Sequence, residues 1–220
     1  MKGLTRELIA LRISKELKDG MFINLGIGIP TLVGNFLPPD SDIILHAENG
    51  ILGYGSIVME PDEWDIDLVN ASGQPIRINP GACFFDFAIS FGMIRGGHLD
   101  VSVLGAFQVS ERGDLANWQV TESPIGVLGG AMDLAIGAKR VIVAMEHTTP
   151  KGKPRIVRDC SLPLTAKEAV DTIVTNLAYI QVIPDGLLLK EVAPGITPEE
   201  VQESTEPKLI ISPELKGMEL

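Results

Sequence analysis

The segment that decides the fold is Phe22-Ile23-Asn24-Leu25-Gly26-Ile27-Gly28-Ile29-Pro30, which leads into an apolar run over residues 31–37. A short apolar run that ends in clustered glycines and continues into a second apolar run is typical of a β-strand, a tight turn and a helix. Units of this kind build α/β proteins, in which helices cover a sheet of buried strands.

The same alternation continues along the rest of the chain. Further strands are predicted over 42–46, 75–78, 101–104, 140–145, 179–183, 187–192 and 209–211, and helices over 4–18, 85–94, 166–175 and 197–200. This order predicts an α/β fold with a largely parallel sheet flanked by helices. The turn sequence Pro184-Asp185-Gly186 predicts an antiparallel hairpin near the C-terminus. No repeat or linker interrupts the pattern, so we expect residues 1–220 to form a single domain.

Composition narrows the function classes. The chain has 220 residues, of which 45% are hydrophobic, and its net charge of −11 is unfavourable for binding nucleic acid. It has no apolar window of about 20 residues that could cross a membrane, and its start does not resemble a secretory signal. The two cysteines, Cys83 and Cys160, have no metal-ligand spacing, so we expect a cytoplasmic setting.

Glycine clusters mark the ends of several predicted strands. Glycine permits a positive φ or a close approach of backbone to ligand, and ligands of open α/β sheets bind beyond the carboxyl ends of strands. Each cluster could be a simple turn, but together they favour a binding site. The first cluster is not a dinucleotide fingerprint, because Thr31 replaces the third glycine and Pro30 interrupts the turn. It is better suited to offering backbone N–H groups to a carbonyl or phosphate oxygen.

Glu48 is the most promising reactive residue. It follows the predicted strand 42–46 in the turn sequence Glu48-Asn49-Gly50, so it should lie at the ligand-binding edge of the sheet. From this context it could be a covalent nucleophile, a general base, a metal ligand or an exposed loop residue. Other candidate reactive groups are less consistent with the sequence. The three histidines lack metal-ligand spacing, Cys83 is expected to be a small core residue, and the sequence has neither a GxSxG motif nor a P-loop.

The sequence resembles the B (beta) subunits of class I 3-oxoacid CoA-transferases over essentially its whole length. The matching segments occur in the family's order: 23–31 (INLGIGIPT), 48–53 (ENGILG), 93–100 (MIRGGHLD), 113–118 (GDLANW), 129–134 (GGAMDL) and 162–165 (LPLT). Each segment alone is weak evidence, but six in the same order are specific. The resemblance implies a CoA-transferase-like α/β fold and a catalytic B-type subunit that moves CoA between an acyl-CoA and a 3-oxoacid.

The resemblance also implies a mechanism and a partner. In that family the glutamate of the ENG segment attacks the donor thioester, and the matching residue here is Glu48. The implied cycle is ping-pong through a glutamyl-CoA thioester, so coenzyme A is a substrate and neither a cofactor nor a metal is implied. One backbone oxyanion donor falls at Gly130, and the other belongs to an A-type (alpha) subunit, which is the expected partner. The implied substrate- and CoA-binding positions are Gly26, Gly28, Asn49, Gly50 and Gly129.

Two departures from the family leave the substrate open. The family usually has serine before the glutamate, where this chain has Ala47. Residues 119–124 (QVTESP) replace the Pro-Gly-Lys stretch of acetoacetate-type members and are closer to 3-oxoadipate-type members. The acceptor could be acetoacetate or 3-oxoadipate, and the donor succinyl-CoA or a short acyl-CoA. Two other functions also stay open: an acyl-CoA hydrolase that uses the same glutamate, and a non-catalytic phosphosugar-binding protein.

Overall fold

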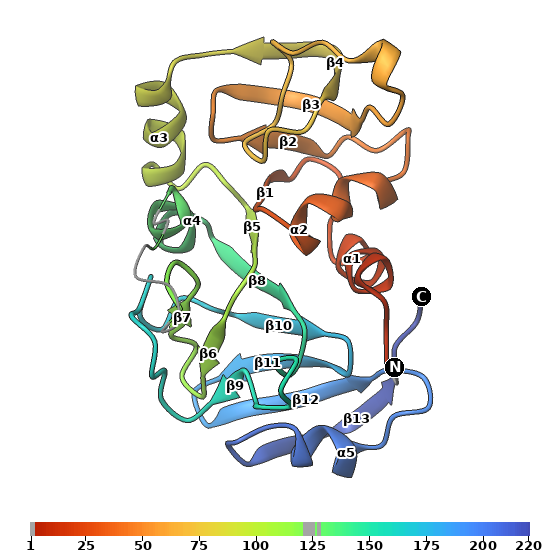
Figure 1. Cartoon of the computed structure of the whole chain (residues 1–220), viewed down its shortest axis with the longest axis vertical. Coiled ribbons are helices and arrows are strands. Elements are labelled where there is room, and N and C mark those ends of the chain that lie inside the picture. The colour runs from red at the N-terminus through yellow and green to blue at the C-terminus, as the bar shows by residue number, and fades with distance from the viewer. Residues whose placement is uncertain (1–2, 121–125, 127–128) are drawn as a thin grey trace.

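A ten-stranded mixed sheet organises the protein (Figure 1). The computed structural model describes residues 3–120, 126 and 129–220. The helices are α1 (Arg6–Ser14), α2 (Ile29–Leu32), η1 (Val33–Phe36), η2 (Pro61–Glu63), α3 (Phe87–Arg95), α4 (Ala131–Gly137) and α5 (Pro198–Glu203). The strands are β1 (Phe22–Leu25), β2 (Ile44–Ala47), β3 (Ile51–Ile57), β4 (Ile76–Phe84), β5 (Val101–Leu104), β6 (Gln108–Ser110), β7 (Leu115–Ala116), β8 (Arg140–Met145), β9 (Ile156–Val157), β10 (Thr172–Thr175), β11 (Ala178–Ile183), β12 (Gly186–Val192) and β13 (Leu209–Gly217).

The main sheet has the order β13-β12-β11-β10-β8-β5-β1-β2-β3-β4, and a smaller sheet has the order β7-β6-β9. The central strands β10, β8, β5, β1 and β2 are parallel and almost entirely buried, as expected when helices cover both faces. Helices α1 and α2 lie on one side of them, and α3 and α4 on the other (Figure 1). Antiparallel strands extend the sheet beyond β2 and beyond β10. The predicted α/β class is therefore confirmed.

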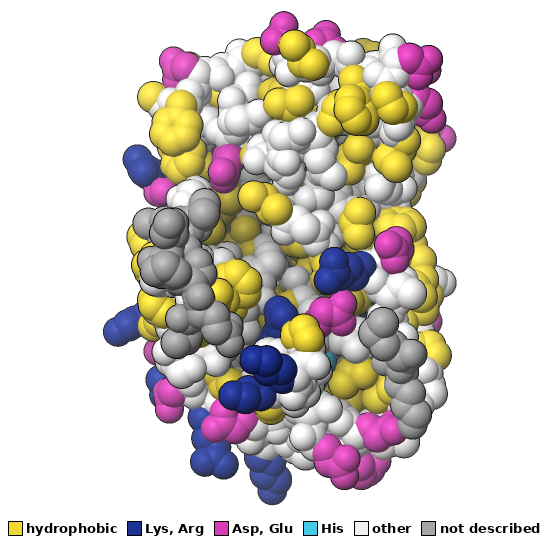
Figure 2. All heavy atoms as spheres, in the orientation of Figure 1, with side chains coloured by type: hydrophobic (Ala, Val, Ile, Leu, Met, Phe, Trp, Pro, Cys, Tyr) yellow, Lys and Arg dark blue, Asp and Glu magenta, His cyan; other side chains and the backbone are white. Residues whose placement is uncertain are grey.

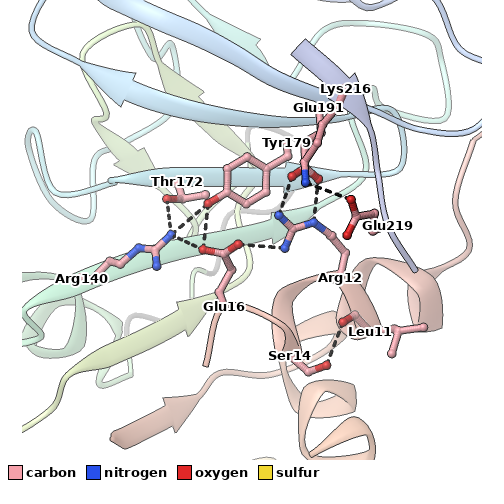
Figure 3. Close-up of polar contacts among 10 residues, drawn as sticks. All are labelled: Leu11, Arg12, Ser14, Glu16, Arg140, Thr172, Tyr179, Glu191, Lys216 and Glu219. Carbon is pink, nitrogen blue, oxygen red and sulfur yellow. Dashed lines mark hydrogen bonds and ion pairs between the residues drawn. The ribbon is translucent and has the colours of Figure 1, made fainter. Parts of the chain in front are cut away.

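A network of ion pairs fixes the end of α1 to the sheet (Figure 3). The buried Arg12 donates from Nε and Nη2 to the Glu191 carboxylate of β12 at 2.7 and 2.8 Å, and from Nη1 to Glu16 at 2.9 Å. Glu16 also accepts from Arg140 of β8 at 3.0 Å and from the Tyr179 hydroxyl of β11 at 3.1 Å. Because groups from three strands converge on α1, the helix has a defined position against the sheet.

Most of the predicted elements are present. The helix predicted over 4–18 is found over Arg6–Ser14, and strands β1, β5 and β8 have the predicted bounds. The predicted hairpin joins β11 to β12. Strands β3, β6, β7 and β9 and helices η2 and α4 were not predicted, and β4 and β13 are longer than expected. Within the described ranges, no helix has the length and apolar character needed to cross a membrane.

Two expectations were wrong. The helix predicted over 166–175 is absent, and its last four residues instead form β10, which pairs with β8 and β11. The segment Thr172-Ile173-Val174-Thr175 is entirely β-branched, and such residues favour a strand when neighbouring strands can pair with them. Cys83 is exposed rather than buried, because β4 lies at the edge of the sheet and, within the described ranges, pairs with β3 alone.

Candidate active site

A cavity of about 610 Å³ lies at the carboxyl ends of β1, β5 and β8. Strand β2 lies on one side of β1, whereas β5 and β8 lie on the other. The cavity is therefore at the point where the strand order reverses, which is the usual ligand position in an open α/β sheet. Figure 2 shows this face hollowed near its middle, with hydrophobic side chains around the hollow and charged side chains along its lower edge.

Gly26 and Gly28 form the part of the cavity wall that follows β1. The Gly26 N–H donates to the Val103 carbonyl oxygen at 2.8 Å, and an added Cβ at Gly26 would lie 3.0 Å from that oxygen. Gly28 has a φ of +92°, which other residues rarely adopt. Thr31, the residue that breaks the dinucleotide fingerprint, donates from Oγ1 to the Gly26 oxygen at 2.9 Å. This hydrogen bond holds the glycine turn against helix α2.

Glu48 lies in the turn between β2 and β3 and lines the cavity. The turn is tight, because the Gly50 N–H donates to the Ala47 carbonyl oxygen at 3.0 Å and Gly50 has a φ of +115°. The Glu48 carboxylate accepts a hydrogen bond from the Gly130 N–H. Burial raises the pKa of the Glu48 carboxyl, the Gly130 hydrogen bond opposes this rise, and the charge of Asp133 adds to it. A partly desolvated carboxylate in a cavity is the environment expected of a reactive group.

A buried hydrogen-bond chain supports the main chain of Glu48. Asn24 Nδ2 donates to His46 Nδ1 at 3.0 Å, so the ring proton is on Nε2, which lies 3.2 Å from Ser90 Oγ. The Ser90 hydroxyl donates to the Glu48 carbonyl oxygen at 2.8 Å. All three supporting side chains are buried, and burial lowers the pKa of His46 to about 4, which keeps the ring neutral. None of the three was predicted as a functional residue, although His46 precedes Glu48 by only two positions.

Gly130 brings the start of α4 directly against Glu48. An added Cβ at Gly130 would overlap the Glu48 carboxylate and lie 3.0 Å from Phe91 Cζ, so only glycine lets the backbone approach this closely. Gly129 precedes it with a φ of +51°. The cavity thus brings together most of the predicted site residues: Gly26, Gly28, Glu48, Gly129 and Gly130.

Asn49 and Gly50 were predicted as binding residues, but neither is part of the cavity wall. Asn49 is exposed and donates from Nδ2 to the Val69 carbonyl oxygen at 2.8 Å. Gly50 is buried, and an added Cβ there would overlap the Phe85 carbonyl oxygen. Both residues therefore shape the turn that presents Glu48.

Among the described residues, the charged side chains of the cavity wall are Glu48, Glu146, Arg6 and Arg155. Arg6 Nε lies 3.4 Å from Glu146 Oε1, and Arg155 Nη1 donates to the Ala106 carbonyl oxygen at 3.1 Å. Arg155 was also not predicted from the sequence. In the described part of the chain, no three or more His, Cys, Asp and Glu side chains are grouped so as to hold a metal ion. The cavity can therefore combine a reactive carboxylate with cationic groups that attract an anionic ligand.

The profile of the family described as Coenzyme A transferase matches residues 6–204, and the chain belongs to that family. Within the family it is a B-type, or beta, subunit. It is 46% identical over 209 residues to the B-type subunit of the 3-oxoadipate CoA-transferase of Acinetobacter baylyi, covering 94% of this chain and 95% of that protein. It is also 46% identical over 215 residues to the beta subunit of the acetate CoA-transferase of Haemophilus influenzae, covering 98% of this chain and 96% of that protein.

A solved structure has the same fold. The crystal structure of an acyl-CoA transferase from Escherichia coli O157:H7, in a thioester complex with CoA, matches 100% of this chain with a TM-score of 0.77 and 24% identity. This chain spans 43% of the length of that protein. The predicted fold and family are confirmed, and membership of an enzyme family excludes the non-catalytic phosphosugar-binding alternative.

Proposed function

We propose that this chain supplies the nucleophile, Glu48, of a two-subunit transferase that moves CoA from succinyl-CoA or a short acyl-CoA to a 3-oxoacid. The observation that carries the proposal is the position of the Glu48 carboxylate, which lines the cavity beside the Gly130 N–H with its pKa raised by burial. A carboxylate suits this reaction, because thioester and acid exchange through an acyl intermediate without hydrolysis.

The proposed cycle has two halves. The Glu48 carboxylate attacks the acyl-CoA carbonyl carbon, the C–S bond breaks, and a mixed anhydride and a CoA thiolate result. The thiolate then attacks the glutamyl carbonyl carbon, which releases the donor's carboxylic acid as its carboxylate and leaves a glutamyl-CoA thioester. The incoming 3-oxoacid carboxylate repeats the two steps in reverse and leaves as its CoA ester.

Gly130 has a second role in this proposal. Negative charge develops on the thioester oxygen during attack, and a backbone donor aimed at such an oxygen contributes about 3–4 kcal/mol in comparable acyl-transfer sites. The Gly130 N–H already reaches the Glu48 carboxylate, so it lies close to where that oxygen would form. We propose that an A-type subunit supplies the other donor, because the cavity is open to solvent at the described surface (Figure 2).

The acceptor class rests on the family resemblance and on one variable segment. The named relatives differ in substrate, one acting on 3-oxoadipate and the other on acetate. Gln119 and Val120 line the cavity, whereas the remaining four residues of the predicted substrate-type segment, 121–124, lie outside the described residues. We propose an acceptor of the acetoacetate or 3-oxoadipate type. We further propose that residues 1–220 act as one domain in the cytoplasm, because isolated cysteines suit a reducing compartment.

Trapping the covalent intermediate tests the proposal. The chain and its A-type subunit are mixed with acetoacetyl-CoA, without acceptor acid, and reduced with borohydride, and the Glu48 peptide is examined by mass spectrometry. We expect reduction at Glu48, dependent on the A-type subunit and absent in Glu48→Gln. An unmodified peptide from an intact complex, with other acyl-CoA donors also tried, would overturn the nucleophile assignment. Release of free CoA that does not depend on an acceptor acid would instead identify the hydrolase.

A further inference from the structure

Arg155 is a cavity-lining cation with few partners. It lies between β8 and β9, and its main chain is held at the end of β8 by the hydrogen bond from its N–H to the His147 carbonyl oxygen at 3.1 Å. Toward the described residues its side chain donates once, from Nη1 to the Ala106 oxygen after β5. Nε is enclosed and has no hydrogen-bond partner among the described residues. No described carboxylate lies within ion-pair distance of this guanidinium.

The charges near Arg155 largely oppose one another. Burial lowers the pKa of its guanidinium, Glu146 opposes that effect, and the like charge of Arg6 adds to it. Glu146 is already paired with Arg6, through the 3.4 Å contact from Arg6 Nε. Arg155 is half-buried, and partial burial of a charge without a close counter-ion costs folding free energy. A retained cost of this kind in a cavity is a sign of function.

We propose that Arg155, assisted by Arg6, binds an oxyanion of the substrate, a phosphate of CoA or a free carboxylate of the organic acid. This inference rests on the proposed function, because it names the ligand group that the same cavity would recognise. The planar guanidinium can offer parallel N–H donors to either oxyanion. Because the chain's net charge of −11 is unfavourable for anions overall, a local cation in the cavity favours binding of such a group.

The sheet order places Arg155 within reach of either oxyanion. Arg155 contacts the end of β5, Glu48 follows β2, and β1 lies between these strands. Two strand spacings of about 4.8 Å place the two strand ends on the order of 10 Å apart. The pantetheine arm of CoA has roughly 13 bonds between sulfur and phosphorus and reaches on the order of 15 Å at about 1.2 Å a bond. A six-carbon dicarboxylic acid, with roughly five such bonds, reaches about 6 Å, and contacts of about 3 Å at each end extend this span to about 12 Å. Both ligand groups can therefore bridge Glu48 and Arg155, and the binding test distinguishes them.

The test compares Arg155→Gln with Arg112→Gln, each assembled with the A-type subunit. Arg112 is a matched control, because its side chain is exposed and pairs with Asp159 at 2.9 Å outside the cavity. Calorimetry measures the Kd of CoA, and steady-state rates measure the KM of the 3-oxoacid. Loss of a charge-assisted hydrogen bond should weaken binding about 10- to 100-fold. A higher Kd for CoA with an unchanged acid KM identifies the phosphate, and the reverse result identifies the carboxylate.

If Arg155→Gln changes both the Kd of CoA and the KM of the 3-oxoacid by less than about threefold, the inference is overturned. If Arg155→Gln does not assemble, Arg155→Lys replaces it, since lysine keeps the charge but lacks the planar fork. We expect that variant to weaken the same ligand about threefold or more, and wild-type affinity for both ligands would again overturn the inference. CoA binding is measured without chemistry, whereas borohydride trapping reports on Glu48. Failure of the Arg155 site is thereby distinguished from failure of the proposed function.

Discussion

The buried chain behind Glu48 gives the sharpest mutational prediction. His46→Leu removes both ring nitrogens from a fully buried side chain. The Asn24 amide then loses the acceptor Nδ1, and Ser90 Oγ loses the donor Nε2. A buried polar group left without a partner costs about 1–3 kcal/mol, which gives about 2–6 kcal/mol for two. Asn24 still donates to the main-chain oxygen of residue 46 and Ser90 still donates to Glu48. We therefore expect the lower part of that range, about 2–4 kcal/mol.

His46→Gln is the matched control. Its amide oxygen can accept from Asn24 and its amide nitrogen can donate to Ser90, so most of the lost stability should return. Urea unfolding measures the stability, and steady-state kinetics with the A-type subunit measures the catalytic effect. We expect His46→Leu to lower kcat about 10- to 100-fold with the KM for the acyl-CoA nearly unchanged, because a small displacement of a nucleophile affects the reacting state most.

Two results would refute this reasoning. Equal stability and kcat in the wild type and His46→Leu would show that the chain neither stabilises nor positions Glu48. Equal losses in His46→Leu and His46→Gln would assign the effect to ring packing against Phe85, whose ring centroid lies 6.0 Å away, rather than to hydrogen bonding.

Three further predictions follow from the site and from α1. Because burial raises the pKa of Glu48, the folded protein binds a proton at this carboxyl more tightly than the unfolded chain does. The protonated carboxyl therefore contributes to the free energy of unfolding at low pH, and this contribution is lost as the pH rises through the folded-state pKa. Glu48→Gln should therefore raise Tm at pH 8 and match the wild type near about pH 4 in scanning calorimetry; a lower Tm at pH 8 would contradict this. Gly130→Ala should reduce turnover about 100-fold or more, because its Cβ overlaps the Glu48 carboxylate, whereas Gly92→Ala, with open space around its Cβ, should keep normal rates. Comparable loss in both glycine variants would remove the steric explanation. Arg12→Met should cost about 3–5 kcal/mol in urea unfolding by leaving Glu191 buried without its partner, and adding Glu191→Leu should recover most of the loss; a cost below about 1 kcal/mol would show that the pair is not structurally important.

The α/β class could be predicted because its signals are local. The apolar run 22–25 and the glycine turn after it specify strand and turn through spacing of neighbours alone, and β1, β5 and β8 form where that spacing predicts them. Residues 166–175 show the limit of such signals. Their pattern fits a helix as well as a strand, and the pairing of β10 with β8 and β11 decides between the two.

For the candidate site, the sequence alone predicted Glu48 and its glycine turn and, by resemblance, the glycines expected around it. Only the tertiary structure decided the contacts that hold Glu48 in place. Ser90 donates to its main-chain carbonyl oxygen and is itself supported by the Asn24–His46 pair, and Arg155 reaches Ala106 across 49 positions of sequence. Such contacts leave no periodic trace in the sequence, because they depend on the order in which separate strands join the sheet. That order is set by burial of whole faces and long-range hydrogen bonding rather than by any local pattern.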